Sequence, residues 1–248
     1  VRGILLGIGL SLLLLAVTAA VSASSIVDSS LNKIDYFEDE GASDEALELH
    51  DQLTIVDMHA DTLLWNRDLN DYGSRGHVDV PRLQQGNVAV QVFSSVSKTP
   101  RGQNYDSNSA DGDNITLLTI VQGQPIRTWK SQLERSLYHA KKLETAAKES
   151  DGQLQLIHDR GELADFLLAR EKDPELVGAI FSVEGLHNLE GEFKNIEKLF
   201  DAGMRMAGFT HFFDNELAGS MHGEKKGGLT EFGEKTFDEL QRLGVVID

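Results

Sequence analysis

Short apolar runs recur along this chain and alternate with longer stretches of helical periodicity. Each run is rich in Val, Ile, Leu, Phe or Met, and polar or glycine residues bound it, which is typical of a strand that is buried on both faces. The predicted strands are residues 53–61, 87–94, 176–183, 204–210 and 245–247.

Helical patterns fill the intervals, and we predict helices over residues 126–148, 162–172, 193–202 and 230–243. Asp159 and Thr230 precede two of them as N-caps, and Gly203 and Gly244 follow two of them as left-handed ends. Strands that alternate with helices indicate an α/β protein with a parallel sheet. The pattern fits a TIM-like (β/α)₈ barrel, of which the chain holds roughly the first five strands, or an open doubly wound sheet.

The chain begins with a segment that we expect to lie outside the fold. Arg2 precedes an apolar run from Ile4 to Val17, and small residues follow as far as Ala23. This order is typical of a secretory signal, and an uncleaved membrane anchor is the alternative. We therefore expect export to the periplasm, or anchoring to a membrane with the domain facing the periplasm or exterior.

Three parts of the chain follow from this pattern. Residues 1–23 are the signal or anchor, residues 24–41 a polar acidic tether, and residues 42–248 the barrel domain. The chain stops at Asp248 inside an apolar run, so we expect the domain to be incomplete at its C-terminus.

The amino-acid composition excludes several classes of binding partner and of reactive site. The 248 residues include 40 Asp and Glu against 23 Lys and Arg, for a formal net charge of -17. Nucleic acid and anionic lipid surfaces are both bound through Lys and Arg, so neither is expected as a partner. The chain has no cysteine, which excludes disulfides, thiolate metal ligands and cysteine nucleophiles.

Three of the first four predicted strands end in a side chain that can bind a metal or act in catalysis. His59 and Asp61 stand two residues apart on the first strand, so period two places them on one face. Glu184 closes the third strand and His211 the fourth. Imidazole and carboxylate groups are ligands for divalent metals, and barrel chemistry occurs where strands end.

Other histidines have simpler interpretations. The second His-x-Asp pair, His77 and Asp79, runs into Pro81 and is expected to be structural. His187 and His222 are expected in solvated loops next to the strand ends, with contact to the substrate as the alternative for either. His211 taken alone fits a hydrogen-bonded core histidine equally well. The long polar loop over residues 97–114 is expected to form a lid or rim at the barrel mouth.

Several stretches together resemble the renal (membrane) dipeptidase family, the zinc dipeptidases of the amidohydrolase-type barrels, and its bacterial members in particular. These stretches follow the family order over nearly everything after the leader. They are residues 55–62, 77–83, 88–94, 181–185, 208–215, 227–233 and 243–248.

The resemblance implies a TIM-like barrel of metal-dependent hydrolase type and a role for each matching residue. His59 and Asp61 would ligate one zinc ion, and Glu184 would bridge it to a second. His211 would face the substrate and help to stabilise the tetrahedral intermediate. The histidine ligands of the second zinc would lie beyond Asp248.

The implied function is a zinc-dependent dipeptidase that hydrolyses dipeptides with a metal-bridging hydroxide. Asp57 is expected either to support the ligands from behind or to form an interior ion pair. A homodimer is a further expectation. The alternatives are another amidohydrolase-type hydrolase, such as a lactamase or esterase, a non-catalytic exported binding protein, and an inactive fragment.

Overall fold

The computed structural model describes residues 18, 22–35 and 41–248. Its strands form one six-stranded parallel sheet in the order β1-β2-β4-β5-β6, with β3 paired to β4. The strands are β1 (Ile55–Ala60), β2 (Val88–Val96), β3 (Leu154–Leu156), β4 (Val177–Glu184), β5 (Met204–Ala207) and β6 (Val246–Ile247).

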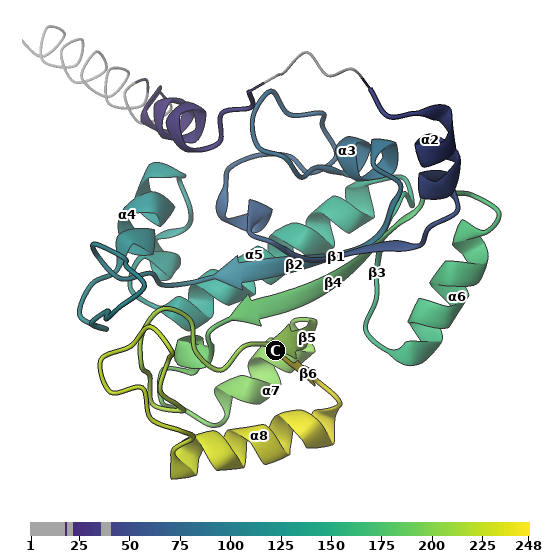
Figure 1. The fold of residues 1–248 in the computed structure, drawn as a ribbon. Helices are drawn as coiled ribbons and strands as arrows, with labels where there is room; N and C mark the ends of the chain where they lie inside the picture. The colour runs from purple at the N-terminus through teal and green to yellow at the C-terminus, as the bar shows by residue number, and fades with distance from the viewer. Residues whose placement is uncertain (1–17, 19–21, 36–40) are drawn as a thin grey trace, which may run out of the picture.

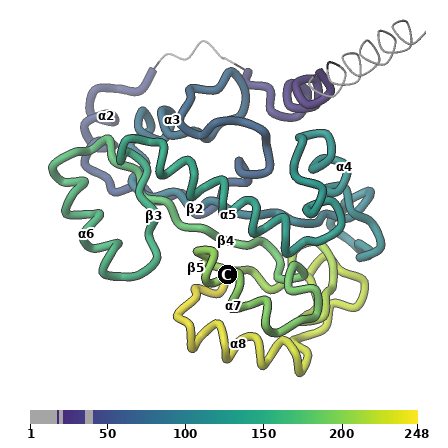
Figure 2. Tube along the Cα trace, turned by 180° about the vertical axis from the view of Figure 1, so that it is seen from behind, coloured from purple at the N-terminus to yellow at the C-terminus, as the bar shows by residue number. Residues whose placement is uncertain are grey.

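Helices follow the strands and pack on the sheet. Helix α5 lies along β2 and β4, and α7 and α8 lie beside β5 and β6 (Figures 1 and 2). The sheet curves with its strands parallel, which confirms the predicted partial TIM-like barrel. The α-helices are α2 (Asp44–Asp51), α3 (Val80–Gln85), α4 (Asn114–Val121), α5 (Gln132–Glu149), α6 (Arg160–Arg170), α7 (Asn195–Asp201) and α8 (Glu231–Leu243), and the 3₁₀ turns are η1 (Thr62–Leu64), η2 (Ile126–Trp129) and η3 (Leu186–Leu189).

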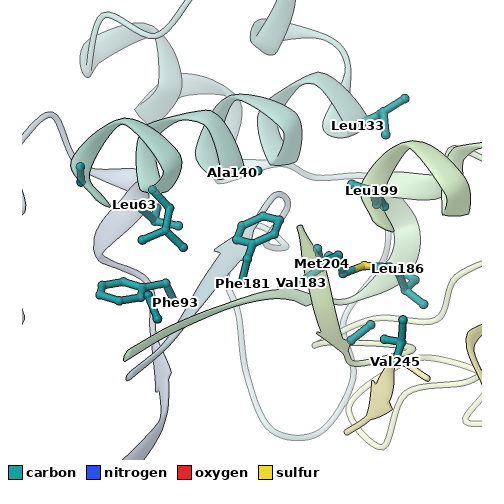
Figure 3. Close-up of a cluster of buried hydrophobic side chains, with 14 of the residues drawn as sticks. Leu63, Phe93, Leu133, Ala140, Phe181, Val183, Leu186, Leu199, Met204 and Val245 are labelled. Carbon is teal, nitrogen blue, oxygen red and sulfur yellow. The ribbon is translucent and has the colours of Figure 1, made fainter. Parts of the chain in front are cut away.

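The main core lies between the sheet and its helices (Figure 3). Alternate residues of β4 face this core, among them Phe181 and Val183, and Leu143 of α5 and Leu199 of α7 pack in the same cluster. All four side chains are buried. Burying each one contributes roughly 1.5–3 kcal/mol, so this layer holds the strands in place.

The five predicted strands are present, with ends that shift by a few residues. Strand β3 was not predicted, because its three residues, 154–156, are too few to show a period. The helix predicted over 126–148 is divided: η2 ends at Trp129, and Ser131 then caps α5 by accepting a hydrogen bond from the backbone N–H of Glu134. Helices α2, α3 and α4 were also not predicted.

The predicted caps are correct. The carboxylate of Asp159 accepts from the backbone N–H of Glu162, and the hydroxyl of Thr230 accepts from that of Gly233. Gly244 ends α8 at φ 74, a left-handed conformation that disfavours residues with a Cβ.

The second His-x-Asp pair is structural, as predicted. Asp79 is the N-cap of α3, where its side chain accepts a hydrogen bond from the backbone N–H of Arg82 and forms an ion pair with the same arginine. His77 is exposed. The carboxylate is therefore occupied in starting a helix.

Part of the predicted tether is an ordered helix that packs on the domain. Residues 22–31 are helical. Asp28 is buried, and its Oδ1 lies 3.8 Å from Arg67 Nε and its Oδ2 3.6 Å from Arg75 Nη1. Two arginines of the segment after β1 thus balance the charge of this carboxylate. Most of the predicted leader, residues 1–23, lies outside the described residues. Within the described ranges, no helix has the length and apolarity needed to cross a membrane.

Candidate metal centre

The carboxyl ends of β1 and β4, together with the loop after β5, bring four predicted residues into one group. His59 Nε2 lies 3.2 Å from Asp61 Oδ1 and 3.8 Å from Glu184 Oε1. His211 Nε2 lies 3.3 Å from the same Glu184 oxygen. Strand β5 ends at Ala207, earlier than predicted, so a loop and not a strand positions His211.

A β-bulge shapes the end of β1. Asp57 pairs with Gln91 and Ala60 with Phe93, so β1 holds one extra residue between these pairs. The strict period-two alternation predicted for this strand is therefore wrong, because a bulge interrupts the alternation. Asp57 Oδ1 accepts a hydrogen bond from the backbone N–H of His59 at 2.9 Å. Asp57 thus holds the backbone that carries His59.

Glu184 is followed by a residue that has to be glycine. Gly185 has φ 81, and a Cβ there would lie 2.7 Å from His187 Nδ1 and 3.3 Å from His211 Cβ. A side chain at this position would push both imidazoles away. The close approach of backbone to ring is what allows Glu184 and His211 to share one site.

His187 does not lie in a solvated loop, and this prediction is wrong. The side chain is buried, and its Nε2 shares a 3.0 Å hydrogen bond with Ser97 Oγ. Burial lowers the pKa of His187 to about 3, so the ring is neutral. Its ring centroid lies 5.0 Å from that of Phe213. Apolar residues flank position 187 in the sequence, but they do not predict the burial of His187 by themselves. The burial also depends on the loop after β2, which places Ser97 against the ring.

The electrostatics of the group favour a cation. Asp61 is the main cause that raises the pKa of His59, to about 9, and Glu184 adds to it. Burial and the nearby charge of Asp61 raise the pKa of Glu184 to about 7. The two carboxylates contribute to both shifts, because each favours positive charge, or a bound proton, in the partly buried space that they share.

The donor set and its spacing fit a metal such as zinc. His59, Asp61 and Glu184 each offer one ligand atom, and these atoms lie within 4.8 Å of one another, the one such group in the described ranges. Zinc held tetrahedrally at about 2.0–2.2 Å separates its ligand atoms by about 3.4 Å. The 3.2 and 3.8 Å separations bracket that value. Asp61 Oδ1 is buried without a hydrogen bond of correct geometry from any described residue, His59 included.

His211 differs from these three residues. Burial lowers the pKa of His211 to about 4, so the imidazole is neutral near pH 7. Nε2 faces Glu184, whereas Nδ1 is buried with no hydrogen-bond partner among the described residues. A neutral ring of this kind can donate one proton from Nε2 to an oxygen in the site.

Two long loops border the centre beyond the arrowheads of β2 and β4 (Figure 1). The first covers residues 97–113, as predicted, and the second covers residues 208–230. They meet where Asn108 pairs with Gly223, and the side chain of Asn108 donates to the backbone carbonyl of His222 at 2.9 Å. The predicted rim therefore consists of two loops that are joined by hydrogen bonds.

Comparison with known proteins adds the following findings. The profile of the membrane dipeptidase family (peptidase family M19) matches residues 43–248. The dipeptidase aclJ of Aspergillus oryzae is 25% identical over 214 residues, which cover 79% of this chain and 44% of the relative. An uncharacterized dipeptidase of Schizosaccharomyces pombe is 25% identical over 206 residues, with 78% and 45% covered. The chain thus spans about half the length of the curated relatives it matches.

Solved structures support the fold. The probable dipeptidase PvdM of Pseudomonas aeruginosa superposes with a TM-score of 0.60 at 18% identity, covering 82% of this chain and 48% of that one. A metallopeptidase of Rhodobacter sphaeroides, crystallised with a phosphinate mimic of the dipeptide L-Ala-D-Ala, gives a TM-score of 0.58 at 18% identity, with 79% and 58% covered.

Proposed function

We propose, from the premise that this chain belongs to the membrane dipeptidase family, peptidase family M19, that it supplies metal-binding residues of a zinc-dependent dipeptidase. The observation that carries the proposal is the convergence of His59, Asp61 and Glu184 at the strand ends. Two relatives named as dipeptidases, and a structural neighbour bound to a dipeptide mimic, support a dipeptide as substrate.

Each residue has a role in this proposal. His59 and Asp61 would hold a zinc ion, and the carboxylate of Glu184 would be available to it and to a second. When bound, zinc acidifies water and polarises the peptide carbonyl. Asp57 keeps the backbone of His59 in the bulged conformation that this ligand set needs.

His211 acts on the substrate. Its low pKa keeps the ring neutral, and in the tautomer with the proton on Nε2, the nitrogen that faces Glu184, the ring donates a hydrogen bond to the carbonyl oxygen as negative charge develops there. The lack of a side chain at Gly185 leaves room for this histidine beside Glu184, because a Cβ there would lie 3.3 Å from His211 Cβ. The residues therefore divide into three that bind metal and one that donates a hydrogen bond.

Metal removal tests the proposal. The full-length protein is treated with a chelator, dialysed and assayed with L-Ala-L-Ala and L-Ala-D-Ala before and after zinc is restored. We expect hydrolysis to disappear and then return with zinc. Activity that survives complete metal removal would overturn the proposal, and zinc-dependent cleavage of an ester or β-lactam without dipeptide cleavage would favour the other hydrolase interpretation.

Export to the periplasm or the membrane surface remains part of the proposal, and it rests on Arg2 and the apolar run that follows. N-terminal sequencing of the protein purified from cells tests it, because a signal peptidase would leave a new terminus near Ala23. An unprocessed terminus in a protein found in the membrane fraction would favour the anchor. The proposed homodimer is tested by light scattering of the same preparation.

A further inference from the structure

A row of aromatic rings leads from the candidate metal centre to the rim of the sheet. The ring of His211 lies 4.4 Å from that of Phe212, at an interplanar angle of 62°. Phe212 stacks on His222 at 5.3 Å and 25°, and His222 meets Tyr105 edge-on at 5.4 Å and 72°. Because His211 contacts Glu184, this aromatic row (residues 211, 212, 222 and 105) begins inside the site.

The outer end of the aromatic row is open to solvent. Tyr105 is 81% exposed, and Phe212 and His222 are partly exposed. Aromatic rings are large apolar surfaces that are normally buried or used in contacts. Here ring surface remains available within a short distance of the metal-binding residues.

Polar contacts, and not burial of the rings, hold the aromatic row in place. Asn104 Oδ1 accepts from the backbone N–H groups of the two residues after Tyr105, at 2.9 and 2.8 Å. The buried side chain of Asn108 donates to the backbone carbonyls of Asn104 and His222. His222 Nδ1 donates to the carbonyl of Tyr105 at 2.8 Å, which fixes the tautomer of that ring. The loops thus present the rings in a fixed order.

We infer that Phe212, His222 and Tyr105 form the surface that receives one side chain of a dipeptide substrate and that favours aromatic or large apolar side chains over small ones. The inference rests on the proposed function. Aromatic rings attract one another at centroid distances of 4.5–7 Å, which an incoming ring can adopt beside Tyr105 or His222. The net charge of -17 acts against acidic side chains.

The simpler interpretation is that the rings only tie the two loops together. That role would affect all substrates equally, because a displaced loop disturbs the site whatever the side chain. A substrate-binding role would change the preference between side chains. The two interpretations therefore differ in a ratio of activities.

The test is hydrolysis of L-Ala-L-Ala, L-Phe-L-Ala and L-Ala-L-Phe by the zinc-loaded full-length protein, with kcat and KM measured separately. We expect one Phe dipeptide to be preferred. Tyr105→Ala should lower kcat/KM for it by about 2- to 12-fold through KM, while Ala-Ala stays within about twofold. Tyr105→Phe should keep the preference. Tyr72→Ala, which removes an exposed ring on another loop, is the matched control and should change nothing.

Each contrary outcome has its own meaning, with zinc content measured alongside. If zinc is retained and Ala-Ala is cleaved, two results would overturn this inference alone: no preference for either Phe dipeptide, or a preference that survives Tyr105→Ala. The same holds if all three substrates slow together. Absence of zinc binding and of all dipeptide cleavage would overturn the proposed function and this inference with it.

Discussion

Two histidines, one at the end of β1 and one on α5, show how environment separates a proposed metal ligand from a core residue. His59 is partly exposed beside two carboxylates, and its pKa is raised to about 9. His139 on α5 is fully buried with no carboxylate partner, and burial lowers its pKa to about 3. The same type of side chain therefore binds a proton more strongly than a free histidine in one place and more weakly in the other.

The hydrogen bonds around the two rings differ in the same way. His139 Nδ1 donates to Ser95 Oγ at 2.8 Å, and its Nε2 accepts from the amide of Gln124 at 3.3 Å, so the neutral ring is fully paired. At the strand ends, Asp61 Oδ1 and His211 Nδ1 are buried without hydrogen bonds from described residues. The ring of His139 is thus paired by scaffold residues, whereas these two unpaired atoms belong to residues of the candidate metal centre.

The largest expected effect is on the metal-binding side of this comparison. Glu184→Gln removes a charge that the proposed zinc ions need, so we expect dipeptide hydrolysis to fall by more than about 10³-fold and zinc content to drop. Steady-state kinetics and metal analysis measure both. His77→Ala is the matched control, because this exposed histidine belongs to the structural His-x-Asp pair, and its activity should equal that of the wild type. Near-normal rates in Glu184→Gln would remove the basis for the metal site.

The next effect is on stability and not on zinc. His139→Ala leaves a cavity and removes one hydrogen bond each from Ser95 Oγ and Gln124 Nε2, so we expect the free energy of unfolding to fall by about 2–5 kcal/mol. Urea titration followed by circular dichroism measures this change. Zinc bound per folded molecule should be unchanged, and a loss of zinc in a folded variant would contradict the separation of the two regions.

The free energy of unfolding should depend on pH because of the buried, neutral His139. His139 has a pKa of about 3 when folded and about 6.5 when unfolded, so between these values the unfolded chain binds more protons and stability falls as pH falls. The contribution of His139 is fully present above about pH 6.5, and about 2 kcal/mol of it is lost by pH 5. Urea titrations at pH 7.5 and 5 should show a smaller difference for His139→Gln than for the wild type. An equal difference in both proteins would assign the acid sensitivity to other groups.

The smallest expected effect concerns the support of His59. Asp57→Ala removes the acceptor for the backbone N–H of His59, and we expect zinc affinity to fall by about 10-fold. Asp57→Asn keeps an oxygen acceptor and should stay closer to the wild type. Isothermal titration with zinc compares the two variants, and equal affinities would show that this hydrogen bond does not position the ligand.

The fold and the convergence of the proposed metal ligands were predictable for a physical reason. Parallel strands are apolar and short, helix caps have marked side chains, and the ends of strands bring distant residues such as His59 and Glu184 together. What the sequence did not reveal depends on tertiary contacts: the bulge at Asp57, the burial of His187 and the stacking of His222. Local pattern indicates which residues can do chemistry, but the loops that fold over them decide their environment.

The most direct test of the central claim is anomalous diffraction at the zinc absorption edge from crystals of the full-length protein grown with zinc. We predict an anomalous peak within about 2.0–2.2 Å of His59 Nε2 and of carboxylate oxygens of Asp61 and Glu184. Well-ordered density for these three side chains with no anomalous peak between them would contradict the account.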